Sequence, residues 1–184
     1  MAKSKEARLK NEIFMYLAAI MAVCLLAISG LAFWAHNFVS DMVSSELAAQ
    51  KIYFPKKGSP SLDPAKYPDL QKYAGQLVDT PEEAKAYANG YIGRHLHDIA
   101  GGKSYAEVSA AAAKDPDNQK LQQQKQSLFQ GETLRGILLT SGYGMGLVGK
   151  VAGAAAVVTA TLGVTLLAAA GVLLAALVAL VGDH

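Results

Sequence analysis

The sequence of 184 residues contains one cysteine, Cys24, so it cannot form an intramolecular disulfide. Cys24 lies inside an apolar run, where a neutral thiol packs as a small hydrophobe. The chain also lacks the Cys-x-x-Cys-His pattern of haem attachment, the ligand spacings of zinc sites and the Gly-Lys-Ser/Thr loop that cradles phosphates. The Gly-x-Ser-x-Gly turn of a nucleophilic serine is missing too. We therefore expect a protein with no cofactor and no enzymatic activity.

Two long stretches contain almost no charge. Residues 13–38 contain no charged side chain, and Lys150 is the only one in residues 137–181. A bilayer core of about 30 Å requires about 20 helical residues at 1.5 Å each. The sequence therefore predicts a mostly α protein with transmembrane helices at residues 13–38 and 151–181.

The second apolar stretch is too long for one straight span, since residues 137–181 would form a helix of about 68 Å. A hairpin of two spans would bury Lys150 near the middle of the membrane, and no proline or polar turn between Thr159 and Gly163 reverses the chain. We therefore favour one span, with Lys150 extending to the outer interface. The glycine-rich residues 137–150 are expected to bend or to lie along the membrane surface.

Basic residues precede the first span and predict its orientation. Lys3, Lys5, Arg8 and Lys10 lie within residues 1–12, and short segments rich in Lys and Arg stay in the cytoplasm. We expect a plasma-membrane protein with the tail 1–12 and the end 182–184 in the cytoplasm. Residues 39–136 would then form a small, mainly helical extracytoplasmic domain.

Two processed forms are alternatives to an uncleaved first span. The apolar core of a signal peptide has about 7 to 15 residues, whereas this run is longer and ends in aromatic residues, Phe33, Trp34 and Phe38. A lipoprotein would use Cys24, but Val23 precedes it where a small residue is expected. Both alternatives are disfavoured, and His36 is interpreted as a membrane-interface residue beside Trp34.

The central region is electrically balanced and predicted to be helical. Residues 41–135 contain twelve Lys plus Arg and twelve Asp plus Glu, which gives no reason to expect nucleic acid as a partner. Residues 51–54 are strand-like, and residues 55–68, with four prolines, indicate a loop. Three helices should follow, the first from Thr80 to Gly101, the second from Ser104 to Asp115 and the third over about 116–130. Thr80 with Glu83 and Ser104 with Glu107 have the spacing of capping boxes. In the third helix Leu121, Leu128 and Phe129 are the expected apolar anchors.

One face of the first predicted helix is apolar and aromatic. It contains Ala84, Tyr87, Ala88, Tyr91, Ile92, His95, Leu96 and Ile99. We interpret it as the packed side, or, if partly exposed, as the wall of a ligand pocket formed by Tyr87, Tyr91 and His95. A metal site of His95 and His97 is disfavoured, because helical residues two apart point about 200° from each other. His95 should be packed and His97 solvated.

Small residues in and before the second span have the spacing of close helix contacts. They are Gly142, Gly146, Gly149, Ala152, Gly153, Ala156, Ala160 and Gly163. Rows of small residues three or four apart let helix backbones approach. We therefore expect Gly149, Gly153, Ala156, Ala160 and Gly163 to form a helix-packing strip against the first span or a neighbouring protein, although membrane helices are also generally rich in Ala and Gly.

Several segments together resemble a family of actinobacterial two-span membrane proteins. They are residues 54–64, 72–75, 84–88, 104–109 and 128–136. The size and layout also resemble those of small accessory subunits of the cytochrome bc and cytochrome oxidase supercomplex in such bacteria. The resemblance implies no catalytic residue.

These observations favour a non-enzymatic accessory or structural subunit of a larger integral membrane complex, with the respiratory supercomplex as the expected partner. The alternative is an envelope-facing ligand-binding or sensor module anchored by two helices. A pocket would leave Tyr87, Tyr91 and His95 partly exposed, whereas a scaffold would bury them.

Overall fold

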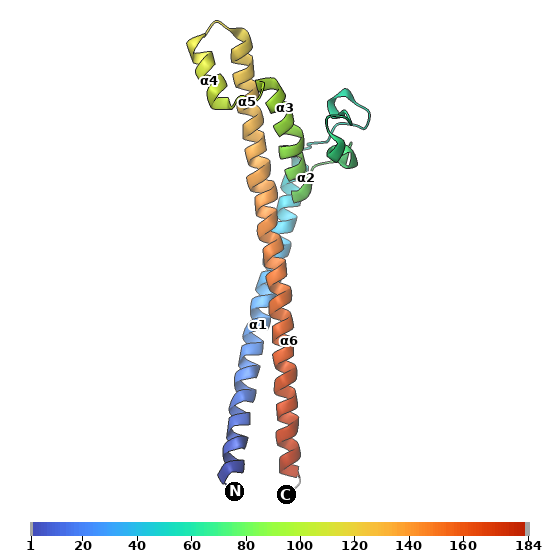
Figure 1. Ribbon diagram of the computed structural model, residues 1–184. Helices are drawn as coiled ribbons and strands as arrows, with labels where there is room; N and C mark the ends of the chain where they lie inside the picture. The colour runs from blue at the N-terminus through green and yellow to red at the C-terminus, as the bar shows by residue number, and fades with distance from the viewer. Residues whose placement is uncertain (1, 183–184) are drawn as a thin grey trace. The chain divides into compact units, whose positions relative to one another are not determined.

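A computed structural model describes the backbone of residues 2–182 and the side chains of residues 6–179. The chain forms two compact units: unit 1 is Met1–Phe38 with Gly149–His184, and unit 2 is Val39–Val148. The long helices α1 (Ala2–Ala49) and α6 (Met145–Gly182) each contribute to both units (Figure 1). Apart from the backbone of Gly182, the predicted cytoplasmic end lies outside the described residues.

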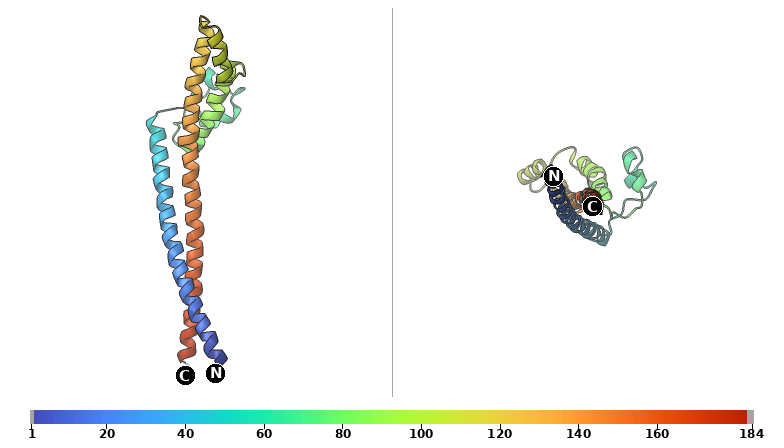
Figure 2. Two further views of the ribbon diagram at one scale, coloured as in Figure 1. Left: turned by 90° about the vertical axis from the view of Figure 1, so that its left-hand side faces the viewer. Right: turned by 90° about the horizontal axis from the view of Figure 1, so that it is seen from below.

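In unit 1, α1 and α6 pack as an antiparallel pair. Ser29 Oγ donates a hydrogen bond of 2.8 Å to the Ala156 carbonyl, and His36 Nδ1 lies 2.8 Å from the Gly149 carbonyl oxygen. Residue numbers rise along α1 while those of its partners fall along α6. The helix ends nearest the two chain termini therefore lie at the same end of the pair (Figures 1 and 2).

Both helices of unit 1 are long and apolar enough to cross a membrane. Their bulky side chains are mostly exposed, among them Phe14 at 65%, Leu31 at 69%, Val157 at 67% and Val172 at 70%. A core helix of a water-soluble protein would bury such side chains, because apolar surface is costly in water. The two predicted spans are thus confirmed as apolar helices of membrane-crossing length.

α1 extends beyond the predicted span at both ends. Near its start, pairs four residues apart stabilise the helix, with Arg8 Nε 3.1 Å from Glu12 and Lys10 Nζ 2.9 Å from Glu6. Near its end, Val43 and Leu47 are 3% and 4% exposed in the core of unit 2. The last turns of α1 are therefore part of unit 2.

Unit 2 contains short helical segments and one long helix. In chain order they are η1 (Pro60–Leu62), η2 (Pro68–Tyr73), α2 (Pro81–Lys85), the π-helix η3 (Ala86–Ile92), α3 (Gly93–Ala100), α4 (Tyr105–Lys114), α5 (Gln119–Ile137) and the π-helix η4 (Leu138–Gly144). The segment with η1 and η2 lies on one side of α2 and α3, and α5 lies on the other (Figures 1 and 2). The core of unit 2 lies between these elements.

The two predicted capping boxes are confirmed by their hydrogen bonds. Thr80 Oγ1 accepts from the Glu83 amide at 3.3 Å, and the Glu83 carboxylate accepts from the Thr80 amide at 3.1 Å. Ser104 and Glu107 form the same reciprocal pair at the start of α4. Gly101, with φ of 59°, ends α3 in the left-handed conformation that favours glycine.

The first predicted helix is interrupted by the π-helix η3, which the sequence pattern did not indicate. The buried residues of the whole segment formed by α2, η3 and α3 are spaced by four, at Ala84, Ala88, Ile92, Leu96 and Ala100. Four residues advance an α-helix by about 40° beyond a full turn, so a straight α-helix would rotate this row off the core. A π-turn adds one residue and keeps the row facing inward. His95 is therefore exposed, and the prediction that it is packed was wrong.

The third predicted helix is longer than expected and starts later. Asn118 caps α5 by accepting from the Leu121 amide at 3.2 Å, and the helix continues past Gly131 to Ile137. A Cβ at Gly131 would lie 2.5 Å from Leu96 Cδ2, so the glycine lets α3 and α5 approach closely. Leu128 is buried, but Phe129 is 54% exposed, which contradicts its prediction as an apolar anchor.

The predicted strand at residues 51–54 is reduced to one bridge between Tyr53 and Leu77. The loop that follows is held by buried side chains, with Phe54, Leu62 and Leu70 each at most 2% exposed. Two short 3₁₀ helices, η1 and η2, begin at prolines of this loop.

The glycine-rich residues 137–150 are helical throughout. Gly142 packs closely on unit 2, since a Cβ there would lie 2.9 Å from Ala84 Cβ and 3.2 Å from Leu47 Cδ2. A Cβ at Gly146 would collide with the Pro81 ring. Most of the segment predicted to be interfacial therefore belongs to unit 2, where its glycines allow close contact with α2.

Candidate functional site

The predicted helix-packing strip of α6 lies against α1. Ala156 is 4% exposed, Gly149 and Gly163 are buried, and Gly153 and Ala160 are half-buried. A Cβ at Gly153 would lie 3.0 Å from the His36 ring, and one at Gly163 would lie 2.9 Å from Leu26 Cγ. The strip therefore contacts the first span of the same chain.

Two polar contacts of this helix pair were not predicted. Ser29 and His36 each bond to a backbone carbonyl of α6, at Ala156 and Gly149 respectively. Small residues on α6 bring the carbonyls within reach, and an apolar environment disfavours an unpaired polar group. His36 thus has a defined contact with α6.

The aromatic face of η3 and α3 is divided between core and surface. Tyr87 packs edge-on against Phe54, with ring centroids 5.0 Å apart, and Tyr91 packs against Tyr67 at 5.5 Å. Burial raises the pKa of both the Tyr87 and the Tyr91 hydroxyls. His95 stacks on Tyr91 with centroids 6.5 Å apart, and these two side chains line a groove of about 290 Å³ between α3 and α5. Tyr87 lies outside that groove, so the three residues do not form one wall.

The two histidines of α3 are both exposed, and each contacts a different neighbour. His97 is exposed, with its Nδ1 3.7 Å from the Asp98 carboxylate, and His95 lies against Tyr91. Within residues 6–179, no group of three or more His, Cys, Asp or Glu side chains is placed to hold a metal ion.

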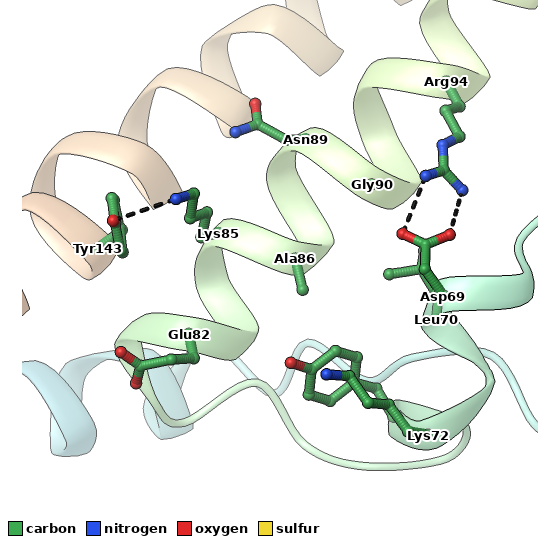
Figure 3. A pocket seen from close by; sticks show the side chains of 11 residues that line it. Asp69, Leu70, Lys72, Glu82, Lys85, Ala86, Asn89, Gly90, Arg94 and Tyr143 are labelled. Carbon is green, nitrogen blue, oxygen red and sulfur yellow. Dashed lines mark hydrogen bonds and ion pairs between the residues drawn. The ribbon is translucent and has the colours of Figure 1, made fainter.

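A groove of unit 2 lies between η2 and the helical segment formed by α2, η3 and α3 (Figure 3). Its volume is about 530 Å³. The floor is formed by Leu70, Ala86 and Gly90, and a Cβ at Gly90 would lie 2.9 Å from Leu70 Cδ2. The rest of the lining is polar or aromatic: Asp69, Lys72, Tyr73, Glu82, Lys85, Asn89, Arg94 and Tyr143.

An ion pair closes one end of this groove. Arg94 binds Asp69 through two bonds of 2.7 and 2.9 Å, and the guanidinium lowers the pKa of the Asp69 carboxyl. A second pair, Lys66 with Asp98, also joins the loop to α3 and lowers the pKa of Asp98. Both pairs are exposed, so each stabilises the fold only slightly.

Two lysines at the groove lie over tyrosine rings. Lys85 Nζ is 4.5 Å from the centroid of Tyr143 and 3.1 Å from its hydroxyl. Lys72 Nζ is 4.8 Å from the centroid of Tyr73. A cation over an aromatic face is attracted by the ring quadrupole. The rings therefore hold both ammonium groups in place at the surface of the groove.

None of the groove residues was singled out from the sequence. Lys72 and Lys85 are far from Tyr143 in sequence, and only folding brings them together, so spacing contained no signal for them. The polar residues Asn89 and Arg94 within an otherwise apolar helical pattern were the one available hint. In comparisons with known proteins, the chain matches no family model and has no significant similarity to a curated protein or a solved structure.

Proposed function

We propose that this chain is a non-enzymatic structural subunit of a larger membrane complex, anchored by α1 and α6 with its basic N-terminal tail in the cytoplasm. Unit 2 would then lie on the outer side of the plasma membrane. The observation that supports this proposal is a second small-residue face on α6. It consists of exposed residues within unit 1: Ala154, Thr161, Thr165, Ala168 and Ala176.

This second face points away from α1. At about 100° per residue, Ala154, Thr161 and Ala168 lie within about 40° of one another around the helix axis. The buried residues Ala156 and Gly163 lie about 180° to 200° from Ala154. After α1 has covered one side of α6, the opposite side presents these small residues together with Val172, which points in the same direction as Ala154 and is 70% exposed.

The outward surface of α1 is different, because it presents large side chains. Phe14, Leu31 and Trp34 are 65%, 69% and 65% exposed. Lipid tails solvate such side chains well, whereas close packing between helices in a membrane depends on small residues that let backbones approach. The contrast between these side chains and the small residues Ala154, Thr161 and Ala168 supports lipid contact for the outward surface of α1 and protein contact for the second face of α6. Other exposed side chains of α6, such as Val157, are bulky.

An aromatic pair offers a second contact in unit 2. Tyr105 of α4 and Phe129 of α5 are 39% and 54% exposed, and their ring centroids are 6.0 Å apart. Aromatic residues are enriched in protein interfaces. We propose that this pair braces an extracytoplasmic part of the same complex. The resemblance to actinobacterial accessory subunits makes the cytochrome bc and cytochrome oxidase supercomplex the first complex to test.

Purification of the tagged chain in mild detergent, followed by quantitative mass spectrometry, tests the proposal. Large membrane subunits should co-purify in a fixed ratio with the unmodified protein. Ala154→Leu and Ala168→Leu should reduce that ratio without reducing the amount of the chain in the membrane, because apolarity is retained.

Val164→Leu is the matched control, since Val164 is 59% exposed on the flank of α6 and already bulky. It should co-purify as the unmodified protein does. Recovery of the unmodified chain without stoichiometric partners would refute the subunit proposal. Equal recovery of partners with all variants would refute the role of this face.

The alternative, a ligand-binding or sensor module, is less well supported at the predicted residues. Tyr91 and His95 line a groove of about 290 Å³, but Tyr87 is packed against Phe54 outside it. A sensor of this kind would show ligand-dependent protection of Tyr91 and His95 from chemical modification. A structural subunit would show protection by its partner of the thiols introduced in Ala154→Cys and Ala168→Cys.

A further inference from the structure

Lys72 and Lys85 differ from the other cations around the groove of Figure 3. Arg94 is paired with Asp69, Lys66 with Asp98 and Arg135 with Glu132. The ammonium groups of Lys72 and Lys85 lie over the rings of Tyr73 and Tyr143 instead. Lys72 also interacts electrostatically with the Asp69 carboxylate, which Arg94 already binds. The groove therefore contains two positive charges that tyrosine rings hold in position, beside the carboxylates of Asp69 and Glu82.

Neutral hydrogen-bond donors accompany these charges. The Tyr143 oxygen accepts from Lys85 Nζ at 3.1 Å, which leaves its own O–H available to donate. Asn89 Oδ1 accepts two bonds from Arg135, of 3.2 and 3.0 Å, and this fixes the side-chain amide with its NH₂ group as the remaining donor. Asn89 and Tyr143 both line the groove, so its polar lining supplies donors for an anion with several oxygens.

We propose that this groove binds a phosphate group, either as a free anion or as part of a lipid headgroup, through Lys72 and Lys85. A phosphate offers more acceptor oxygens than a carboxylate, and lysine binds it as a compact point charge. The floor of Leu70, Ala86 and Gly90 accommodates the apolar part of a phosphate ester. The volume of about 530 Å³ is within the usual range for small ligands, roughly 300 to 1,000 Å³.

The π-helix η3 gives the groove its shape. Ala86, Asn89 and Gly90 are all residues of η3, whose extra residue per turn alters the spacing of side chains on this side. π-turns within α-helices occur frequently at functional sites. This observation is independent of the charge pattern and points to the same surface.

The test uses the full chain in phosphatidylcholine nanodiscs, titrated with inorganic phosphate by isothermal calorimetry. Saturable binding at one site is expected. Lys72→Gln and Lys85→Gln should each weaken it by about tenfold, since a hydrogen bond to a charged group contributes roughly that factor or more. Lys120→Gln, which removes the same charge from an exposed position of α5, should leave the affinity unchanged.

A second arm distinguishes the two sources of the phosphate group. The protein is purified from membranes containing phosphatidylglycerol, and bound lipid is counted by native mass spectrometry. If a lipid headgroup is the ligand, retention of phosphatidylglycerol should fall in both groove variants and not in Lys120→Gln, while free phosphate binds weakly.

Lys85→Arg provides a check against misfolding, because it keeps the charge and should retain binding when Lys85→Gln does not. Equal phosphate affinity and equal lipid retention in all variants would overturn the proposal. The proposal would also be overturned if the unmodified protein neither bound inorganic phosphate nor retained phosphatidylglycerol. Neither result bears on the second face of α6, so this proposal can fail while the subunit proposal stands.

Discussion

The start of α2 depends on reciprocal hydrogen bonds between Thr80 and Glu83. The Glu83 carboxylate also accepts from the Asp79 amide at 3.2 Å, so one side chain satisfies two backbone donors. Removal of the cap hydroxyl in Thr80→Ala should cost about 0.5 to 2 kcal/mol. Hydrogen exchange of the amides in residues 81–92 should therefore accelerate about 2- to 30-fold, as measured by mass spectrometry.

Thr80→Ser is the control for this prediction because serine keeps the capping hydroxyl. Its exchange should remain close to that of the unmodified chain. Unchanged exchange in Thr80→Ala would mean that the packing of Ala84 and Ala88, both fully buried, holds α2 without help from the cap.

The ion pairs of Asp69 and Asp98 predict how the loop at residues 55–78 responds to acid. Arg94 and Lys66 lower the pKa values of these carboxyls below the ordinary 3.8. A lowered folded-state pKa stabilises the fold fully at pH values above the unfolded pKa, and the contribution is lost as the pH falls through the folded value. Loop protection should therefore decline below about pH 4, as checked by hydrogen exchange of the Leu70 amide. In Asp69→Asn the Leu70 amide should exchange faster at neutral pH than in the unmodified chain. Its protection from exchange should then decrease less when the pH is lowered.

At the scale of elements, alanine substitutions at two glycines of α5 should change the stability of the fold in opposite directions. A Cβ added at Gly136 would meet nothing within 4 Å, so Gly136→Ala should stabilise the helix by about 0.5 to 1 kcal/mol through propensity alone. At Gly131, the added methyl group would meet the side chain of Leu96, which is only 4% exposed. Overpacking costs about 1 to 3 kcal/mol, so Gly131→Ala should be destabilising overall.

Thermal unfolding of the full chain in detergent, followed by circular dichroism, compares these two variants. The apparent melting temperature should rise for Gly136→Ala and fall for Gly131→Ala. Equal increases would show that α3 can move away from α5 at little cost.

Because α1 and α6 pack closely, we expect a large side chain on the helix-packing strip of α6 to separate the two helices. Gly163→Leu would collide with Leu26 and with the Ala22 carbonyl oxygen, which would lie 3.2 Å from the first added carbon. Unfolding in sodium dodecyl sulfate, followed by fluorescence of the single tryptophan Trp34, should occur at lower detergent fractions than in the unmodified chain. Ala168→Leu on the opposite face is the control and should leave this transition in place. A similar transition in both variants would contradict the contact with α1.

Sequence patterns predicted the elements that depend on local chemistry. The caps at Thr80 and Ser104 and the glycine end of α3 need only neighbouring residues, so spacing was sufficient to find them. The π-turn in η3 was missed because it results from packing: the core requires a row of residues spaced by four, and the backbone adjusts to supply it. The exposed position of His95 follows from that adjustment and could not be obtained from α-helical periodicity.

The groove illustrates a further limit of sequence reasoning. Lys85 and Tyr143 are 58 residues apart, and their contact depends on the packing of α2 against η4. Gly142 permits this packing by avoiding a collision with Ala84, yet in the sequence it appeared only as one of several glycines near a span. The helix-packing strip of α6 could be predicted from the spacing of small residues, but only the structure identifies α1 as the helix that it contacts.

For the whole molecule, the antiparallel contacts of α1 and α6 predict a topology with both chain ends on one side of the membrane. The basic residues from Lys3 to Lys10 favour the cytoplasm as that side. In a Cys24→Ala background, Lys57→Cys, at an exposed position of the loop, should react with an impermeant maleimide in intact cells. Lys5→Cys and Asp183→Cys should react only after the cells are permeabilised. Labelling of positions 5 and 183 but not 57 in intact cells would reverse the orientation. Labelling of only one of the two ends would contradict an antiparallel pair of spans, because two crossings must return the chain to the side from which it started.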